Sequence, residues 1–186
     1  MENEALLIMD VQKSIVGRFQ DRLGNLCENL KLVTDAARQK GVIPIYIRVA
    51  FRGDGSDVNK DNKVFANLAS DFSMGAEGIE IEPSCGYNAT DIVVNKKRVS
   101  AFAGSDLELV LRSLHIKTLV LSGIATSGVV LSTVRQAADL DFGLIVLSNC
   151  CADMDDEVHS VLINKVFPRQ CEVMTAKEYC SRLTGK

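Results

Sequence analysis

Three polar positions in this chain could do chemistry together. Asp10, Lys96 and a turn at residues 123–129 each follow a short apolar run. A carboxylate beside an ammonium can transfer protons, because the lysine holds the aspartate ionised or stabilises developing negative charge. A tight turn between a strand and a helix exposes a side chain and directs backbone N–H groups at a bound molecule. Nucleophiles are often mounted on such corners, but this one carries Val129.

Alternating strand and helix patterns must position these residues. Short apolar runs predict strands at residues 5–9, 42–49, 91–94, 118–121, 144–147 and 171–174. Helical spacing predicts helices at residues 23–40, 106–114, 132–139, 157–166 and 175–183. Repeated βα units predict an α/β fold with three layers and a mostly parallel sheet.

Ligands of open α/β sheets bind outside the carboxyl ends of the strands. We therefore expect Asp10, Lys96 and the turn to converge at one edge of the sheet. Taken singly, an aspartate that ends a strand, such as Asp10, is more often a helix cap or a hydrogen-bonding loop residue, and Lys96 could be a solvated member of the basic run 96–98. Their shared position at strand ends favours a site.

Composition bounds the function classes. The 186 residues, 47% of them hydrophobic, suffice for one sizeable core, so we expect a single domain over residues 1–186. The net charge is −3 and basic residues are scattered, which argues against nucleic acid. No apolar run approaches the roughly 20 residues of a membrane span. No secretory signal opens the chain, so we expect a cytoplasmic protein.

Six cysteines occur without C-x-x-C spacing, which favours buried, reduced thiols. They are Cys27, Cys85, Cys150, Cys151, Cys171 and Cys180. Residues 50–88 break the strand–helix rhythm with many Gly, Asp and Asn residues. A long loop in a compact domain is usually functional, disordered or an assembly element. A plain surface excursion remains equally open for this segment.

Three ordered motifs resemble the isochorismatase-like cysteine hydrolase family, which includes nicotinamidases and N-carbamoylsarcosine amidohydrolases. The motifs are residues 10–12, 96–107 and 123–128, and the resemblance extends from residue 6 to about residue 173. It implies the isochorismatase-like hydrolase fold, with a six-stranded sheet of order 3-2-1-4-5-6. It also implies a triad of aspartate, lysine and cysteine, of which the first two map to Asp10 and Lys96.

The resemblance further implies a cis peptide bond between Ile124 and Ala125. Together with Thr126, these residues would form a turn whose N–H groups near Ala125 and Val129 bind an oxyanion. The family's cysteine aligns with Val129, so hydrolysis through a thioester is not expected. True isochorismatases also lack the cysteine and cleave a vinyl ether with an aspartate that donates a proton. They carry a small residue there, so bulkier Val129 makes isochorismate itself doubtful.

Nicotinamidases of the family bind a metal through an Asp-x-His element after the second strand. Here residues 48–52 lack histidine, and none precedes His115, so we expect no metal. No Walker motif and no G-x-G-x-x-G motif follows a strand, and we expect no cofactor. His115 and His159 are interpreted as structural or surface residues.

Several other residues could contact a substrate. Arg48 and Arg52 could bind a carboxylate through two hydrogen bonds, or could simply be solvated. Gln12 could contact the ligand or orient Asp10. Phe19 and Phe102 could form apolar walls.

Other groups near the turn have plainer interpretations. The hydroxyls of Thr126 and Ser127 are expected to cap the following helix. Cys150 and Cys151 follow the fifth predicted strand, where one could reach the site, but two small buried apolar residues are the favoured interpretation.

Two hypotheses follow. The chain is a hydrolase of a small molecule that uses Asp10 and Lys96 for proton transfer and water as the attacking group. Alternatively, it is a catalytically impaired family member that binds a small ligand or an assembly partner. A buried Asp10–Lys96 pair would favour the first, because an unneeded buried ion pair is costly. A pocket filled by Val129 would favour the second. The resemblance also implies a homo-oligomer, with residues 50–88 as the natural segment to reach a neighbouring subunit.

Overall fold

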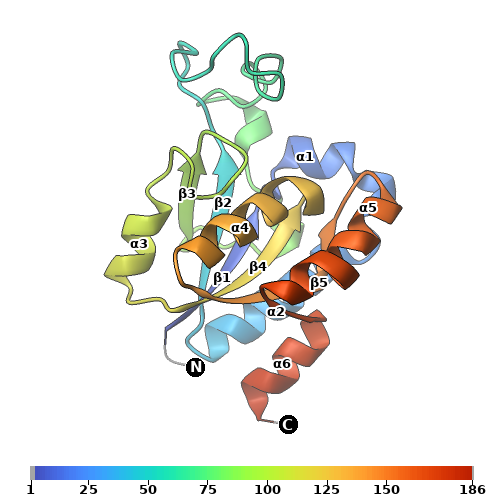
Figure 1. Ribbon diagram of the computed structural model, residues 1–186. Helices are drawn as coiled ribbons and strands as arrows, with labels where there is room; N and C mark the ends of the chain where they lie inside the picture. Colours follow the sequence, from blue (N-terminus) through green and yellow to red (C-terminus); the bar gives the residue numbers. More distant parts are fainter. Residues whose placement is uncertain (1–2, 186) are drawn as a thin grey trace.

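The computed structural model describes residues 3–185, which contain one sheet of six strands (Figure 1). The strands are β1 (Glu4–Met9), β2 (Ile43–Val49), β3 (Ile92–Lys96), β4 (Thr118–Ile124), β5 (Gly143–Ala152) and β6 (Glu172–Met174). Their order is β3-β2-β1-β4-β5-β6, and every neighbouring pair is parallel. The predicted α/β/α fold and strand order are confirmed.

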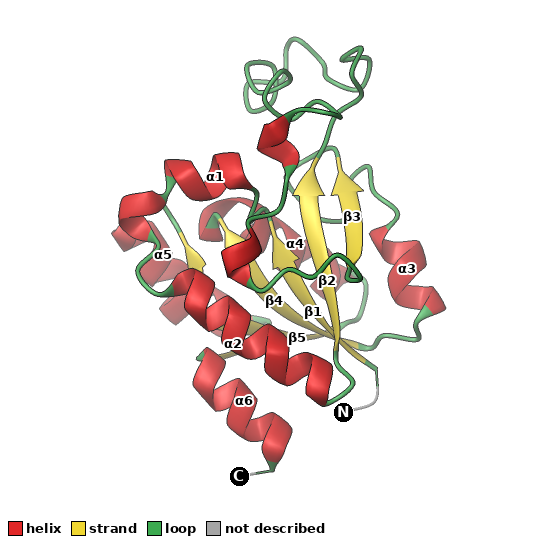
Figure 2. Cartoon of the chain, turned by 180° about the vertical axis from the view of Figure 1, so that it is seen from behind, coloured by secondary structure: helices red, strands yellow, loops and turns green. Residues whose placement is uncertain are grey.

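Helices cover both faces of the sheet. They are α1 (Lys13–Arg18), α2 (Leu26–Gln39), α3 (Leu107–Ser113), α4 (Leu131–Asp139), α5 (Asp156–Val161) and α6 (Ala176–Thr184). α3, α4 and α5 lie on the face seen in Figure 1, and α2 and α6 cover the opposite face seen in Figure 2. No helix within residues 3–185 has the length and apolar character needed to cross a membrane.

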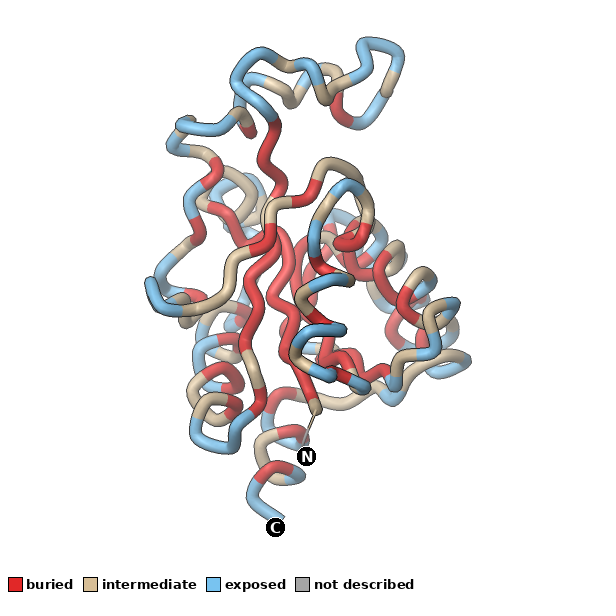
Figure 3. Tube along the Cα trace, turned by 90° about the vertical axis from the view of Figure 1, so that its left-hand side faces the viewer, coloured by how far each residue is buried: buried red, intermediate tan, exposed pale blue. Residues whose placement is uncertain are grey.

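The central strand β1 shows why this sequence forms a sheet covered on both faces. All of its residues are buried. Leu7 and Met9 pack into the layer of α3, α4 and α5, whereas Leu6 and Ile8 pack into the layer of α2 and α6. A strand buried on both sides reads as a continuous apolar run. Figure 3 shows the buried strands running through the middle of the molecule.

Strand β5 is longer than the sequence predicts. The expected strand at residues 144–147 extends to Ala152, with a register shift: Leu121 of β4 pairs with Val146, but Gly123 pairs with Cys151. The polar residues 148–149 interrupt the apolar run and hide this continuation. Cys151 therefore lies within the strand and not after it.

Several short helical elements lie outside the helices predicted from the sequence, and the predicted helix at residues 157–166 divides into α5 and a π-turn. α1 spans only six residues, too few to display a helical period. A π-turn at Thr126–Val130 precedes α4, and a second at Leu162–Val166 follows α5. 3-10 turns lie at Gln20–Arg22, Glu77–Ile79, Pro83–Cys85 and Phe167–Arg169.

The segment between β2 and β3 forms its own small apolar cluster. The cluster contains Val49, Ala50, Phe51, Phe65, Phe72 and Ile79. The Phe51 N–H donates to the Phe72 carbonyl at 2.7 Å, and the Met74 N–H donates to the Phe51 carbonyl at 2.8 Å. In Figure 2 the arrowheads of β2 and β3 point toward the first part of this segment, so that part lies beyond the carboxyl ends of these strands.

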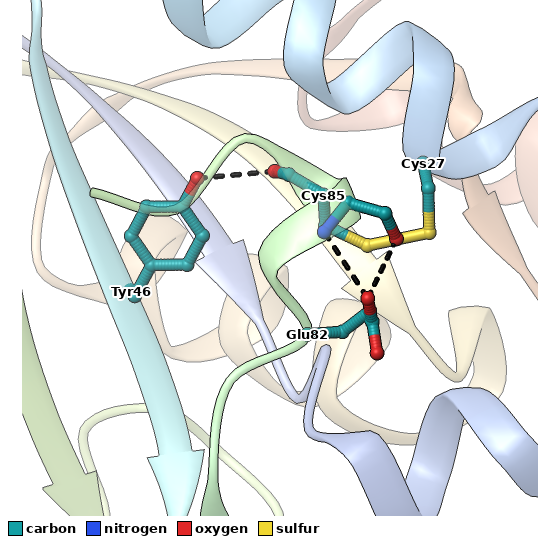
Figure 4. Close-up of a disulfide and its surroundings, with 5 residues drawn as sticks. Cys27, Tyr46, Glu82 and Cys85 are labelled. Carbon is teal, nitrogen blue, oxygen red and sulfur yellow. Dashed lines mark hydrogen bonds between the residues drawn. A yellow bond between two sulfur atoms is a disulfide. The ribbon is translucent and has the colours of Figure 1, made fainter. Parts of the chain in front are cut away.

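Two cysteines are paired, contrary to the expectation of six reduced thiols. A disulfide joins Cys27 of α2 to Cys85, 58 positions later (Figure 4). The Cys85 carbonyl accepts a hydrogen bond from the Tyr46 hydroxyl at 3.1 Å, and Glu82 accepts one from the Ser84 N–H at 3.1 Å. The fold, and no local spacing motif, brings the two sulfurs together. The other four cysteines are free.

Candidate active site

The carboxyl ends of β1, β3 and β4 meet at one cavity. Asp10 follows β1, Lys96 ends β3, and the turn after β4 contributes Ala125 and Val129. The Lys96 Nζ lies 3.0 Å from Asp10 Oδ2. The structure thus places together the three positions that the sequence assigned to one sheet edge, in a cavity of about 270 Å³.

Asp10 is directed into the cavity by a sharp change of backbone direction. Its φ is +57°, in the left-handed region that aspartate tolerates better than most residues. Its N–H donates to the Ile47 carbonyl at 2.8 Å, which ties the end of β1 to β2. The side chain is therefore held on the sheet edge by the backbone itself.

Lys96 is buried, and most of its hydrogen-bond donors already have partners within the protein. Its residue is 1% exposed, and its Nζ donates to the Arg98 carbonyl at 2.8 Å in addition to its contact with Asp10. A lysine ammonium has three N–H donors, so at most one remains for a ligand. The following loop is held by the Ala101 N–H, which donates to the Thr133 hydroxyl at 3.0 Å.

The Asp10 carboxyl has one satisfied and one unsatisfied oxygen. Oδ1 is buried and has no hydrogen-bond partner within residues 3–185. Burial raises the pKa of Asp10 above its ordinary value, and the Lys96 ammonium opposes that rise without cancelling it. Buried polar atoms are almost always paired, so this oxygen is a candidate acceptor for a polar group of a ligand.

The turn after β4 requires glycine at position 123. A Cβ there would lie 2.1 Å from the Met9 carbonyl oxygen, and its φ of +135° is also unfavourable for other residues. Ile124–Ala125 is a cis peptide bond, as the resemblance implies. Val129 is 2% exposed and lines the cavity beside Ala125.

Two hydrogen bonds fix the turn to the segment after β5. The Thr126 hydroxyl lies 2.8 Å from His159 Nδ1, and the Ser127 N–H donates to Asp153 Oδ2 at 2.6 Å. The expectation that the Thr126 and Ser127 hydroxyls cap the following helix is wrong, because neither makes a side-chain cap there. Thr126 is fully buried and does not line the cavity.

The outer wall of the cavity comes from the irregular segment. Its apolar lining residues there are Val64, Phe65, Leu68 and Phe72. Sequence patterns missed them because the segment lacks sustained periodicity. Their gathering within nine positions of an otherwise polar stretch was the available signal. Phe19 lines the cavity as expected, and so does Arg18, which the sequence does not single out.

Other residues expected to contact substrate lie elsewhere. The Gln12 amide bonds to the backbone of Val49, at 2.8 and 3.0 Å, and so joins the start of α1 to the end of β2. Arg48 donates to Asn95 Oδ1 at 2.8 Å, and Phe102 stacks on Phe142 within the main core. None of these three lines the cavity. Their side chains are occupied by partners within the fold.

Arg52 and the cysteine pair also lie away from the cavity lining. Cys150 and Cys151 are buried within β5, and burial raises the pKa of Cys151 to about 12. Cys151 stays a neutral thiol at ordinary pH, consistent with the structural interpretation of the pair. No group of three or more His, Cys, Asp or Glu residues able to hold a metal ion occurs in the described part of the chain.

Comparison with known proteins identifies the family. The isochorismatase domain pattern matches residues 4–178. The chain is 39% identical over 186 residues to the isochorismatase family protein YecD of Escherichia coli O157:H7, covering 96% of this chain and 95% of that protein. It is 33% identical over 182 residues to the family protein YwoC of Bacillus subtilis (strain 168), covering 98% and 95%.

The fold agrees with this similarity. An isochorismatase family protein from Burkholderia thailandensis superposes with a TM-score of 0.88 at 26% identity, covering 99% of this chain and 97% of that one. Both the domain match and the two relatives extend over nearly the whole chain. The chain belongs to the isochorismatase family.

Proposed function

We propose that this chain hydrolyses a small molecule through Asp10 and Lys96, without a covalent intermediate at position 129. The observation that carries the proposal is the unpaired Oδ1 of Asp10, buried beside Lys96 at the inner end of a cavity. A buried ion pair is weak as a device for stability, because desolvation offsets its attraction. A role in proton transfer explains why the pair is present.

Asp10 would move the proton in this reaction. Its raised pKa keeps a larger fraction of the carboxyl neutral than at an exposed aspartate, so it can donate a proton to the departing atom of the substrate. Lys96 would then stabilise the carboxylate that remains. Water attacks the substrate, and the proton that water loses returns to Asp10. The acid is thereby regenerated.

The turn would stabilise charge that develops on the substrate. Ala125 and Val129 line the same cavity as Asp10, and backbone N–H groups near them would act as fixed donors. Donors of this kind stabilise an oxyanion without reorganisation. The Val129 side chain contributes shape only. Its branched, apolar end limits the size of the group that can lie against the turn.

The second candidate function is ligand binding without turnover. Val129 supplies no nucleophile, and the cavity walls are predominantly apolar, as in many binding sites. Under this alternative the Asp10 Oδ1 would simply accept a hydrogen bond from the ligand. A homo-oligomer and a cytoplasmic location, both expected from the sequence, belong to either alternative.

Turnover of a panel of small amides and vinyl ethers tests the proposal. Asp10→Asn preserves shape and removes the acid, so kcat should fall about 100-fold or more. The control is Asp91→Asn, which alters a carboxylate that is 6% exposed and paired with Arg38 at 2.5 Å, away from the cavity. Unchanged turnover in Asp10→Asn would refute the mechanism. Ligand binding by a wild type that hydrolyses no substrate would establish the second candidate.

A further inference from the structure

We propose that the cavity takes a small molecule with a ring-sized apolar body and a carboxylate, and that Arg18 binds the carboxylate at the cavity mouth. The inference names a substrate class and rests on the proposed function for the reacting end of that molecule. Ligand binding tests it separately, since binding needs no turnover.

The size and walls of the cavity define the body of the ligand. Its volume of about 270 Å³ lies just below the roughly 300–1,000 Å³ of sites for drug-sized molecules. Phe19, Phe65 and Phe72 contribute rings, and Leu68 adds an aliphatic side chain. Such walls favour an apolar body, because they offer few hydrogen-bond partners. The volume limits that body to about one ring.

The inner end of the cavity disfavours an anion. Lys96 is 1% exposed and already contacts Asp10 Oδ2 and the Arg98 carbonyl, so its charge is largely used. A carboxylate placed there would also lie beside the Asp10 carboxyl, and two carboxyl groups in contact repel when both are ionised. The unpaired Asp10 Oδ1 instead suits a neutral group, which can accept the Asp10 proton or donate an N–H or O–H to the ionised carboxylate.

Arg18 is the remaining cationic residue of the cavity lining. It ends α1, and its side chain is 49% exposed, which places it at the mouth. Its Nη2 donates to Asp71 Oδ2 at 2.6 Å, its one hydrogen bond to a described residue. A guanidinium carries five N–H donors in a planar fork that matches a carboxylate, so donors remain for a ligand.

Two contacts from the irregular segment hold this guanidinium in place. Asp71 accepts its hydrogen bond, and the Arg18 Cζ lies 5.9 Å from the ring centroid of Phe72, which itself lines the cavity. An exposed ion pair adds little to stability, so the Arg18–Asp71 bridge is not required by the fold. Asp71 occupies one part of the fork and competes with a bound carboxylate for it.

The experiment measures dissociation constants by isothermal titration calorimetry. The probes are phenylacetate and 3-phenylpropanoate, each compared with its primary amide. The wild type should bind the acids more tightly than the amides. Arg18→Met keeps the apolar stem and should weaken acid binding about tenfold while leaving amide binding within about twofold. Asp71→Asn removes the competing carboxylate and should tighten acid binding several-fold.

Arg22→Met is the matched control. Arg22 is 43% exposed and bonds Asp156 at 2.8 Å, and it does not line the cavity, so acid binding should not change. Arg18→Lys keeps the charge but loses the planar fork of donors. Its dissociation constants for the acids should lie between those of the wild type and Arg18→Met. Thermal melts establish that each variant is folded.

Three results would overturn the inference: no binding of acids, equal binding of acids and amides by the wild type, or equal weakening of both by Arg18→Met. Its failure is distinguishable from that of the proposed function. Acid binding that depends on Arg18, without hydrolysis, would overturn only the mechanism. Hydrolysis of neutral substrates without a preference for acids would overturn only the inference.

Discussion

The inner end and the outer wall of the cavity are built in different ways. At the inner end, strand register fixes each group: Lys96 pairs with Val49 across β3 and β2, and Met9, which precedes Asp10, pairs with Gly123. The outer wall belongs to no helix or strand over residues 64–72. It packs in a small apolar cluster, and the exposed bridge from Arg18 to Asp71 links it to α1.

This difference suits the two regions to different tasks: the inner end to chemistry and the outer wall to selection of the ligand. Proton transfer requires atoms held at fixed distances, and a sheet edge provides them. The wall needs only to match the body of the ligand, and an irregular segment can change in sequence without disturbing the sheet. We therefore expect substitutions at the inner end to affect stability and kcat, and substitutions in the wall to affect ligand affinity.

Lys96→Met should have the largest effect on stability. It leaves the Asp10 carboxyl buried without its cation, and breaking a buried pair typically costs about 3–5 kcal/mol. Urea unfolding of the variant and the wild type measures the loss. Lys31→Met removes an exposed lysine that bonds Asp35, and should change stability by less than about 0.5 kcal/mol.

The stability lost in Lys96→Met should depend on pH. Lys96 lowers the pKa of Asp10, so its removal raises the folded-state pKa further above the unfolded value of 3.8. A group with a raised folded pKa contributes most below its unfolded pKa, and the contribution disappears as pH rises through the folded pKa. The deficit of Lys96→Met should therefore be smallest near pH 4 and grow toward neutral pH. A constant deficit would show that Asp10 does not titrate in the cavity.

Phe72→Ala should weaken ligand binding more than it destabilises the protein. Phe72 is buried in the small cluster and lines the cavity. Its loss should cost less than the roughly 3–5 kcal/mol of Phe→Ala in a main core, because the segment can open locally. We expect KM to rise about tenfold with kcat nearly unchanged, since a lost wall contact removes binding shared by ground and transition states.

Phe102→Ala is the control for this prediction. Phe102 lies in the main core and does not line the cavity, so its loss should lower stability at least as much and leave KM unchanged. Steady-state kinetics and urea unfolding of both variants provide the comparison. A kcat that falls in Phe72→Ala would mean that the wall also positions the reacting groups.

Val129→Cys should restore a nucleophile at small cost to stability. A thiol of similar size in a buried site should cost less than about 1.5 kcal/mol. If the corner still has a geometry suited to nucleophilic attack, iodoacetamide should alkylate the introduced thiol, and amide turnover should exceed that of the wild type. Val134→Cys, on the buried side of α4, should resist alkylation. Labelling at position 129 that is as slow as labelling at position 134 would show that the corner is closed to reagents.

The contrast between the regions also explains what the sequence could predict. Asp10 and Lys96 follow apolar runs, and strand ends in a parallel sheet share an edge, so their proximity follows from the topology. Arg18 and Phe72 follow no such rule, because a six-residue helix and an irregular segment leave no period to interpret. Their contribution depends on the path of the chain in three dimensions.

Predictions made from residue type alone placed other side chains in the site, and the structure places them elsewhere. Arg48 and Gln12 have the chemistry to bind a ligand, but the fold uses their hydrogen bonds to connect neighbouring strands and loops. The partners of Arg48, Asn95 and the Ile79 carbonyl, lie 47 and 31 positions away. The pairing of Cys27 with Cys85 is equally non-local. Long-range partners of this kind cannot be read from local patterns.

Val64→Ser should have the smallest effect and is the sharpest test of how the wall behaves. Val64 lines the cavity yet is 53% exposed, so it lies at the rim. An exposed substitution should change stability by less than about 0.5 kcal/mol. If the wall keeps its position when a ligand binds, Val64 gains little burial and the dissociation constant of phenylacetate should change less than about threefold. A change of about tenfold or more would show that residues 64–72 close over the ligand, and the outer wall would then take part in catalysis by excluding water.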